Sequence, residues 1–145
     1  RMLSKAGADM NALDGDAYDV VTIAAVANDT GMLRLALSLQ GSPKNITSPY
    51  DGTALIAAAH LGHVDVVLQL IGAGAPLDHV NNLGWTALIE AVILGDGGLR
   101  HTRIVAALIK AGADASIADR QGVSPLAHAR AKGYDAIIAV LERAK

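Results

Sequence analysis

The sequence predicts an all-α solenoid, in which units of two helices joined by short turns stack along one axis. The first observation is a segment that combines a turn residue with a helix-capping hydroxyl, Gly84-Trp85-Thr86-Ala87-Leu88. Similar segments occur earlier at Asp51–Leu55 and later at Gly122–Leu126, with a weaker copy at Ala17–Val21. The second observation is an independent series of helix-ending pairs that recur at matching intervals: Gly7-Ala8, Gly41-Ser42, Gly74-Ala75 and Gly112-Ala113. A period of roughly 33 residues with a turn and two helices is typical of a repeat protein, because each unit needs its neighbours to bury its faces.

The segment Asn81–Ala118 shows the elements of one unit in order. Leu83-Gly84 is the expected turn, because glycine accepts positive φ without steric cost. Thr86 is expected to cap a short apolar helix over Ala87–Leu94, since its hydroxyl can accept from an amide of the first turn.

Gly95 is expected to close that helix in the left-handed conformation. A second helix is predicted over Thr102–Lys110, where Ile104 and Leu108 are among the apolar residues at helical spacing. Gly112 is expected to end it.

The two markers divide a single domain, residues 1–145, into one partial unit and four repeats. The boundaries are 1–13 for the partial repeat, then 14–46, 47–80, 81–118 and 119–145. In the first full repeat Asp19 takes the place of the capping threonine, and aspartate also caps helices well. Asn28 takes the place of the helix-ending glycine, and asparagine also tolerates positive φ. Residues Arg1–Asn11 match only the end of a repeat, which indicates a truncated or processed N-terminus, or a short cap.

The repeated segments resemble the ankyrin family over essentially the whole chain. The family pattern G-x-T-P-L-H-x-A-A…G-H…V-x-x-L-L…A-G-A-D is matched by GWTALIEAV, HLGHVDVVLQLIGAGAP and IVAALIKAGAD. The family's histidine after the leucine is replaced by Thr22, Ile56, Ile89 and Ala127. The hydroxyl–imidazole hydrogen bonds that the resemblance implies between neighbouring repeats are therefore expected to be missing, with apolar packing in their place. His63 matches a position that the family fills for structural reasons.

Composition excludes several classes of protein. The chain is 52% hydrophobic and 18% charged, which argues against disorder, and its net charge of −2 argues against nucleic-acid binding. Cysteine is absent, so disulfides and thiolate metal sites are excluded, and no run reaches the roughly 20 apolar residues of a membrane span. We expect a soluble bacterial protein without cofactors or membrane insertion, in the cytoplasm, or in the periplasm if an export signal has been removed.

The resemblance implies that a protein partner meets the concave side, formed by the turn tips and the first helices. By register, the candidate groove residues are Tyr50, His60, Leu61, Asn82, Leu83, Trp85, Ile93, Leu94, Arg120, Gln121 and Lys132. Apolar residues among them are candidates for an interface, and tryptophan is enriched among interface anchors. The alternative is that Trp85 and Tyr50 only shield neighbouring turns. Glu90 is either a charge in the groove or a buried acceptor for turn amides.

The third repeat, 81–118, is longer than the repeats on either side of it because it contains a short insertion near 96–101. The glycines of this insertion and the basic residues Arg100, His101 and Arg103 form a loop that we expect to be a solvated surface segment. An anion-binding role is the alternative. The insertion resembles one in bacterial ankyrin-repeat proteins.

Neither a metal site nor a catalytic site is predicted. His60 and His63 are separated by a glycine that ends the helix, and the other histidines are scattered in register. No serine stands in a nucleophile elbow. We therefore predict a non-catalytic, monomeric protein–protein interaction module for a protein of unknown identity. The alternative is a structural or regulatory segment that packs against another part of a longer chain or against a second copy.

Overall fold

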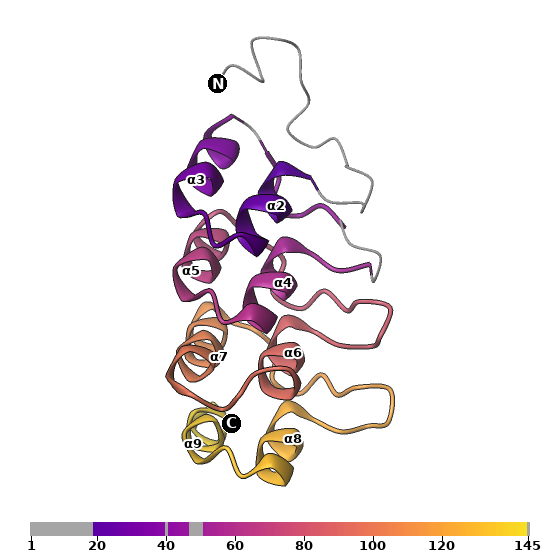
Figure 1. Cartoon of the computed structure of the whole chain (residues 1–145). Coiled ribbons are helices and arrows are strands. Elements are labelled where there is room, and N and C mark those ends of the chain that lie inside the picture. Colours follow the sequence, from indigo (N-terminus) through magenta and orange to yellow (C-terminus); the bar gives the residue numbers. More distant parts are fainter. Residues whose placement is uncertain (1–18, 40, 47–50, 145) are drawn as a thin grey trace.

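The computed structural model describes residues 19–39, 41–46 and 51–144. Figure 1 shows two columns of helices, with α2, α4, α6 and α8 in one column and α3, α5, α7 and α9 in the other. The described residues form helices and no strands, which confirms the all-α solenoid with four helix pairs. The helices are α2 (Val20–Val26), α3 (Thr30–Ser38), α4 (Ala54–Leu61), α5 (Val64–Gly72), α6 (Ala87–Ile93), α7 (Leu99–Ala111), α8 (Pro125–Lys132) and α9 (Asp135–Arg143). The partial repeat predicted at 1–13 lies outside the described residues.

Each helix of the first column begins at a side chain that caps it. Asp19, Thr53, Thr86 and Ser124 each accept a hydrogen bond from the amide three residues later. These bonds satisfy amides that have no partner inside the helix, which is why short helices of seven or eight residues begin at defined positions. The predicted roles of Asp19 and Thr86 are confirmed, and Asn28 has the positive φ expected of it, 56°.

Gly95 has a different role from the predicted one. Helix α6 ends at Ile93, and its cap Leu94 is right-handed, so no left-handed glycine closes this helix. Glycine is needed at this position instead because other atoms of the fold lie too close to Gly95 to leave room for a side chain. A Cβ atom there would lie 2.3 Å from the Ala91 carbonyl oxygen and 2.5 Å from Cδ2 of His101.

Helix α7 begins at Leu99, three residues before the predicted start. Part of the extra sequence of the third repeat is therefore helical, and the expected loop is reduced to the residues between Leu94 and Leu99. His101 is buried, with 5% of its surface exposed, whereas Arg100 and Arg103 are exposed. This corrects the prediction of an extended basic loop.

The core lies between the two columns and between successive pairs. Fully buried leucines, isoleucines and valines from every pair meet there, including Leu33, Leu55, Leu88, Leu108 and Ile137. Small residues such as Ala58 and Ala91 are also fully buried, which lets the helices of the first column approach one another closely.

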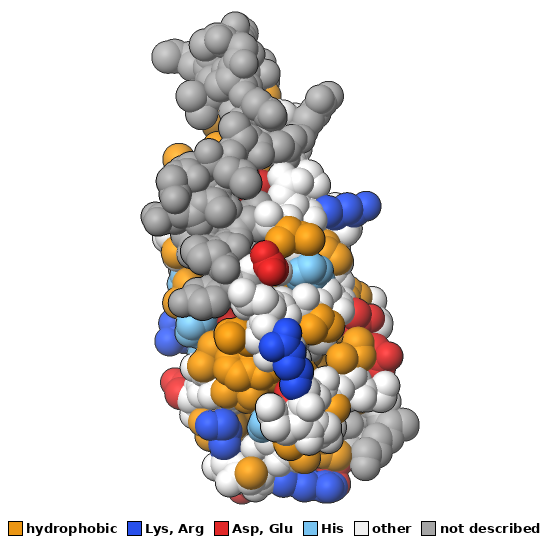
Figure 2. Space-filling view, turned by 90° about the vertical axis from the view of Figure 1, so that its right-hand side faces the viewer, with side chains coloured by type: hydrophobic (Ala, Val, Ile, Leu, Met, Phe, Trp, Pro, Cys, Tyr) orange, Lys and Arg blue, Asp and Glu red, His pale blue; other side chains and the backbone are white. Residues whose placement is uncertain are grey.

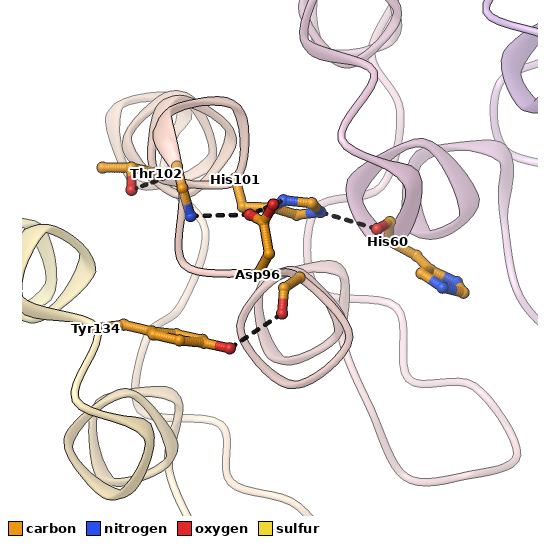
Figure 3. Close-up of polar contacts among 7 residues, drawn as sticks. His60, Asp96, His101, Thr102 and Tyr134 are labelled. Carbon is orange, nitrogen blue, oxygen red and sulfur yellow. Dashed lines mark hydrogen bonds and ion pairs between the residues drawn. The ribbon is translucent and has the colours of Figure 1, made fainter.

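Imidazole side chains bond neighbouring repeats to each other. His63 Nδ1 lies 2.9 Å from the carbonyl oxygen of Ala25 in the preceding pair. His101, at the equivalent position one repeat later, places Nε2 2.9 Å from the carbonyl oxygen of His60 (Figure 3). These imidazole bonds join the repeats in addition to the expected apolar packing, and the structural role of His63 is confirmed.

Tyr134 occupies the same register position in the last repeat. Its hydroxyl donates to the Gly95 carbonyl oxygen at 3.2 Å (Figure 3). Its ring lies against Gly97, where a Cβ atom would approach Cδ1 of the tyrosine to 2.3 Å. The three side chains thus form one recurring brace. It joins the start of α5, α7 and α9 to the end of the first helix in the preceding repeat.

Candidate functional site

A pocket of about 510 Å³ opens on the concave side of the stack, where helices α2, α4 and α6 meet the turns that precede α4 and α6. Most of its wall is apolar. The described residues that line it are Thr22, Val26, Gly52, Thr53, Ile56, Ala57, His60, Leu61, Asn81, Leu83, Trp85, Glu90 and Leu94. We call it the groove pocket.

Three leucines of the groove pocket remain exposed. The exposed fractions are 38% for Leu61, 43% for Leu83 and 41% for Leu94. Figure 2, viewed from the side of the turn tips, shows hydrophobic side chains gathered about halfway along the stack, beside basic ones. These leucines do not belong to the buried core, so the fold leaves them available to another surface.

Asn81 organises the turn that forms one wall of the groove pocket. Its Oδ1 accepts from the amides of Leu83 at 2.9 Å and Trp85 at 3.1 Å. Its Nδ2 donates to Oε2 of Glu90 at 2.6 Å. Gly84 completes the turn with a φ of +83°. Asn81 therefore holds the two apolar turn residues over the pocket and connects them to the helix below.

Glu90 is buried, with 6% of its surface exposed, and lines the groove pocket. The amides of the turn bond to Asn81 rather than to Glu90, so Glu90 is a buried acceptor for a side-chain amide. Burial raises the pKa of Glu90 from its ordinary 4.5 to about 7, although the hydrogen bond from Asn81 acts in the opposite direction. His60 Nδ1 is 3.6 Å from the other carboxylate oxygen, beyond a good hydrogen bond.

The next repeat has the same arrangement, but there the acidic residue lies in the turn and its partner lies on the helix. Asp119 accepts from the amides of Gln121 and Val123 and pairs with His128 Nε2 at 2.7 Å. The amide of Val123, chiefly, holds the pKa of Asp119 below its usual range, and burial opposes this. In the third repeat a neutral amide takes the place of the turn carboxylate, and the carboxylate lies on the helix, inside the pocket.

Comparison with known proteins assigns the family. A family model described as ankyrin repeats (3 copies) matches residues 21–119. The chain belongs to the ankyrin-repeat family. A putative ankyrin repeat protein of Escherichia coli, YahD, is 32% identical over 140 residues, which are 96% of this chain and 69% of YahD.

Solved ankyrin-repeat structures share the fold over nearly all of this chain. An ankyrin repeat domain from Acinetobacter baumannii AYE is 48% identical with a TM-score of 0.94, over 99% of this chain and 72% of that one. The ankyrin repeat protein EF0377 is 34% identical with a TM-score of 0.86, over 97% of this chain and 71% of that one. Ankyrin repeats are in general protein–protein interaction modules without catalytic activity.

The structure brings together part of the predicted set of groove residues. His60, Leu61, Leu83, Trp85 and Leu94 line one pocket of this ankyrin stack.

The other predicted residues that the structure describes do not line this pocket. Arg120, in the turn of the next repeat, places its side chain against Gly84. The Nζ atom of Lys132 is 5.9 Å from the ring centroid of Tyr134. Tyr50 lies outside the described residues. Asn82, Ile93 and Gln121 do not line the groove pocket.

Sequence reasoning missed Asn81 as a member of this site. A signal was present, because Asn81 and Glu90 are nine residues apart, as are Asp119 and His128 one repeat later. A polar pair that recurs in register, with one member in the turn and the other on the helix that follows, indicates a specific contact.

Replacing Glu90 with glutamine is expected to change how stability depends on pH. Between pH 4.5 and about 7 the folded protein keeps a proton on Glu90 that the unfolded chain has lost, so stability falls as pH rises through this window. Glutamine can accept the same bond from Asn81 without this loss. We expect the variant to be more stable than the parent by about 1–3 kcal/mol at pH 8, less than full burial would cause because the pocket is open to water.

Urea unfolding of both proteins at pH 5, 6, 7 and 8 measures this difference. Other titrating groups are common to both, so their effects cancel. A difference in unfolding free energy that stays constant with pH would contradict the raised pKa of Glu90.

No cluster of three or more potential metal-ligating side chains occurs among residues 19–39, 41–46 and 51–144. Over the same residues, every helix is too short or too polar to cross a lipid bilayer.

Proposed function

We propose that this chain is a protein-binding module whose groove pocket receives a segment of a protein partner. The observation that carries the proposal is the group of exposed leucines, Leu61, Leu83 and Leu94, around a pocket that the fold itself leaves open. Burying such side chains against a partner contributes favourable free energy in proportion to the apolar area removed from water.

The rigidity of the surroundings supports this proposal. The turn that bears Leu83 and Trp85 is held by Asn81, and α4 is joined to α7 by the bond between His60 and His101. A surface that is already ordered loses little conformational entropy when a partner binds. Trp85 is half-buried, so its ring is anchored while part of it remains available to a partner.

The test compares two double variants of equal chemistry. Leu83→Ser/Leu94→Ser removes apolar surface from the groove pocket, whereas Leu68→Ser/Leu99→Ser changes two leucines outside it, with exposed fractions of 51% and 66%. Because all four are exposed, both double variants are expected to keep the stability of the parent within about 1 kcal/mol.

Immobilised parent and variants are incubated with lysate of the source cells, and the retained proteins are identified by mass spectrometry. We expect a partner that binds the parent and the Leu68/Leu99 variant but is lost, by tenfold or more, from the Leu83/Leu94 variant. Equal retention by all three would contradict the groove assignment.

Light scattering of the same proteins separates a foreign partner from a second copy of this chain. We expect a monomer for all three. A parent that dimerises and a groove variant that does not would show that the pocket serves self-association instead.

A further inference from the structure

The groove pocket contains a carboxylate whose charge is not balanced by a lysine or arginine among the described residues that line it. Among the described residues, Glu90 is the one acidic side chain that lines it, and no lysine or arginine does. Its Oε2 bonds to the neutral amide of Asn81 at 2.6 Å. A buried carboxylate is costly unless a cation accompanies it.

His60 does not supply that cation near neutral pH. Burial, and to a lesser extent the neighbouring His101, lower the pKa of His60 below its ordinary value, so the imidazole is neutral there. Its Nδ1 also remains 3.6 Å from Glu90 Oε1. In Figure 3 its ring points away from His101, which bonds to the His60 carbonyl and not to the ring. Glu90 thus lines a pocket whose walls are mostly apolar and hold no lysine or arginine among the described residues.

We propose that the groove pocket receives a lysine or arginine side chain of the partner, with its aliphatic part against Leu83, Trp85 and Leu94 and its charged end at the Glu90 carboxylate. The inference rests on the proposed function, because it names the chemistry of the segment that enters the pocket. Long basic side chains combine an apolar stem with a cationic end. The groove pocket offers matching surfaces, since exposed leucines form its rim and the carboxylate of Glu90 is buried below them. An indole ring in the wall also favours a cation. Charge complementarity decides against an acidic or purely apolar occupant.

Proton release accompanies this mode of binding. A cation beside Glu90 lowers the pKa of that carboxyl, so the affinity rises with pH between about 6 and 8. Among the described residues, His60 on α4 is the titratable group within 4 Å of Glu90, and His101 of α7 lies behind it. His128 of the adjacent helix α8 is paired with Asp119. Protonation of His60 at lower pH would repel a cation and acts in the same direction.

The experiment selects random twelve-residue peptides displayed on phage against the immobilised full chain. Peptides that bind the parent but not the Leu83→Ser/Leu94→Ser variant are defined as groove-dependent. We expect a lysine or arginine at one shared position among them, and we expect this preference to disappear when the selection is repeated on Glu90→Gln.

A selected peptide free of His, Asp and Glu then allows the charge to be tested with the parent protein alone. Replacing its basic residue with norleucine removes the cation and keeps the stem. We expect norleucine, or Glu90→Gln in the protein, to weaken binding by about tenfold or more, as when one member of a desolvated charge pair is lost. The affinity of the basic peptide should rise from pH 6 to pH 8, and that of the norleucine peptide should not.

Four results would overturn the inference. Groove-dependent peptides without a shared basic residue would refute it and leave the proposed function standing. Norleucine binding as tightly as lysine or arginine, or affinity that falls as pH rises, would do the same. No groove-dependent peptides at all would count against both the inference and the groove as a protein-binding site.

Discussion

Replacing Gly95 with alanine is expected to lower the free energy of unfolding by about 3 kcal/mol. The added Cβ would lie 2.3 Å from the carbonyl oxygen of Ala91, a backbone atom that cannot move without distorting α6. It would also lie 2.5 Å from the ring of His101, which is itself bonded to the preceding repeat. Both neighbours are held in place, so the overlap cannot be relieved by one side-chain rotation.

Gly72→Ala is the matched control for this prediction. Gly72 is the last residue of α5, and a Cβ there meets nothing within 4 Å. Alanine has the higher helix propensity, so the control should be unchanged or more stable by up to about 1 kcal/mol. Urea unfolding followed by circular dichroism measures both. Two variants of equal stability would show that the close approach at Gly95 is not as described.

Replacing His101 with alanine is expected to lower the free energy of unfolding by about 2–4 kcal/mol, because the change opens a cavity and removes the bond to a partly buried carbonyl. The imidazole is 5% exposed, and its two nitrogens bond to the His60 carbonyl and, at 3.3 Å, to Asp96. It joins the second helix of the third repeat to the first helix of the second repeat. Its loss should therefore weaken the stack between those repeats as well as the local packing.

His79→Ala is the control with the same change of side chain. His79 also bonds to a carbonyl oxygen, that of Asp51 at 2.7 Å, but this contact is exposed and water can replace it. We expect a loss below about 1 kcal/mol. Thermal and urea unfolding of both variants should separate them clearly. A His101 variant as stable as the His79 variant would contradict the brace.

The sequence predicted what depends on residues close together in the chain. The capping bonds of Asp19 and Thr86 span three residues, and the positive φ of Asn28, Gly84 and Gly112 depends on the preferences of single residues. Because these signals recur at a regular spacing, they also predicted the stack of four helix pairs. The resemblance of the chain to the ankyrin family followed from the same recurrence. The matching family model and the similar solved structures confirmed this resemblance.

Positions inside the groove were predicted only in part. Register placed Leu83, Trp85 and Leu94 on the concave side, and the structure gathers them in one pocket. Register could not show whether the side chains of Arg120 and Lys132 reach this pocket, because the direction of a long side chain depends on what lies beside it. Arg120 lies across Gly84, and Lys132 lies near Tyr134.

The sequence by itself determined the fold class, the period and the helix starts of the first column, since each rests on short-range hydrogen bonds and backbone preferences. Only the tertiary structure decided why Gly95 is glycine, where α7 begins and how His101 joins two repeats, because these depend on atoms as many as 41 residues apart. It also decided the state of Glu90. A carboxyl group of ordinary acidity becomes one with a pKa of about 7 because the folded chain surrounds it with apolar side chains and leaves it one neutral amide as a partner.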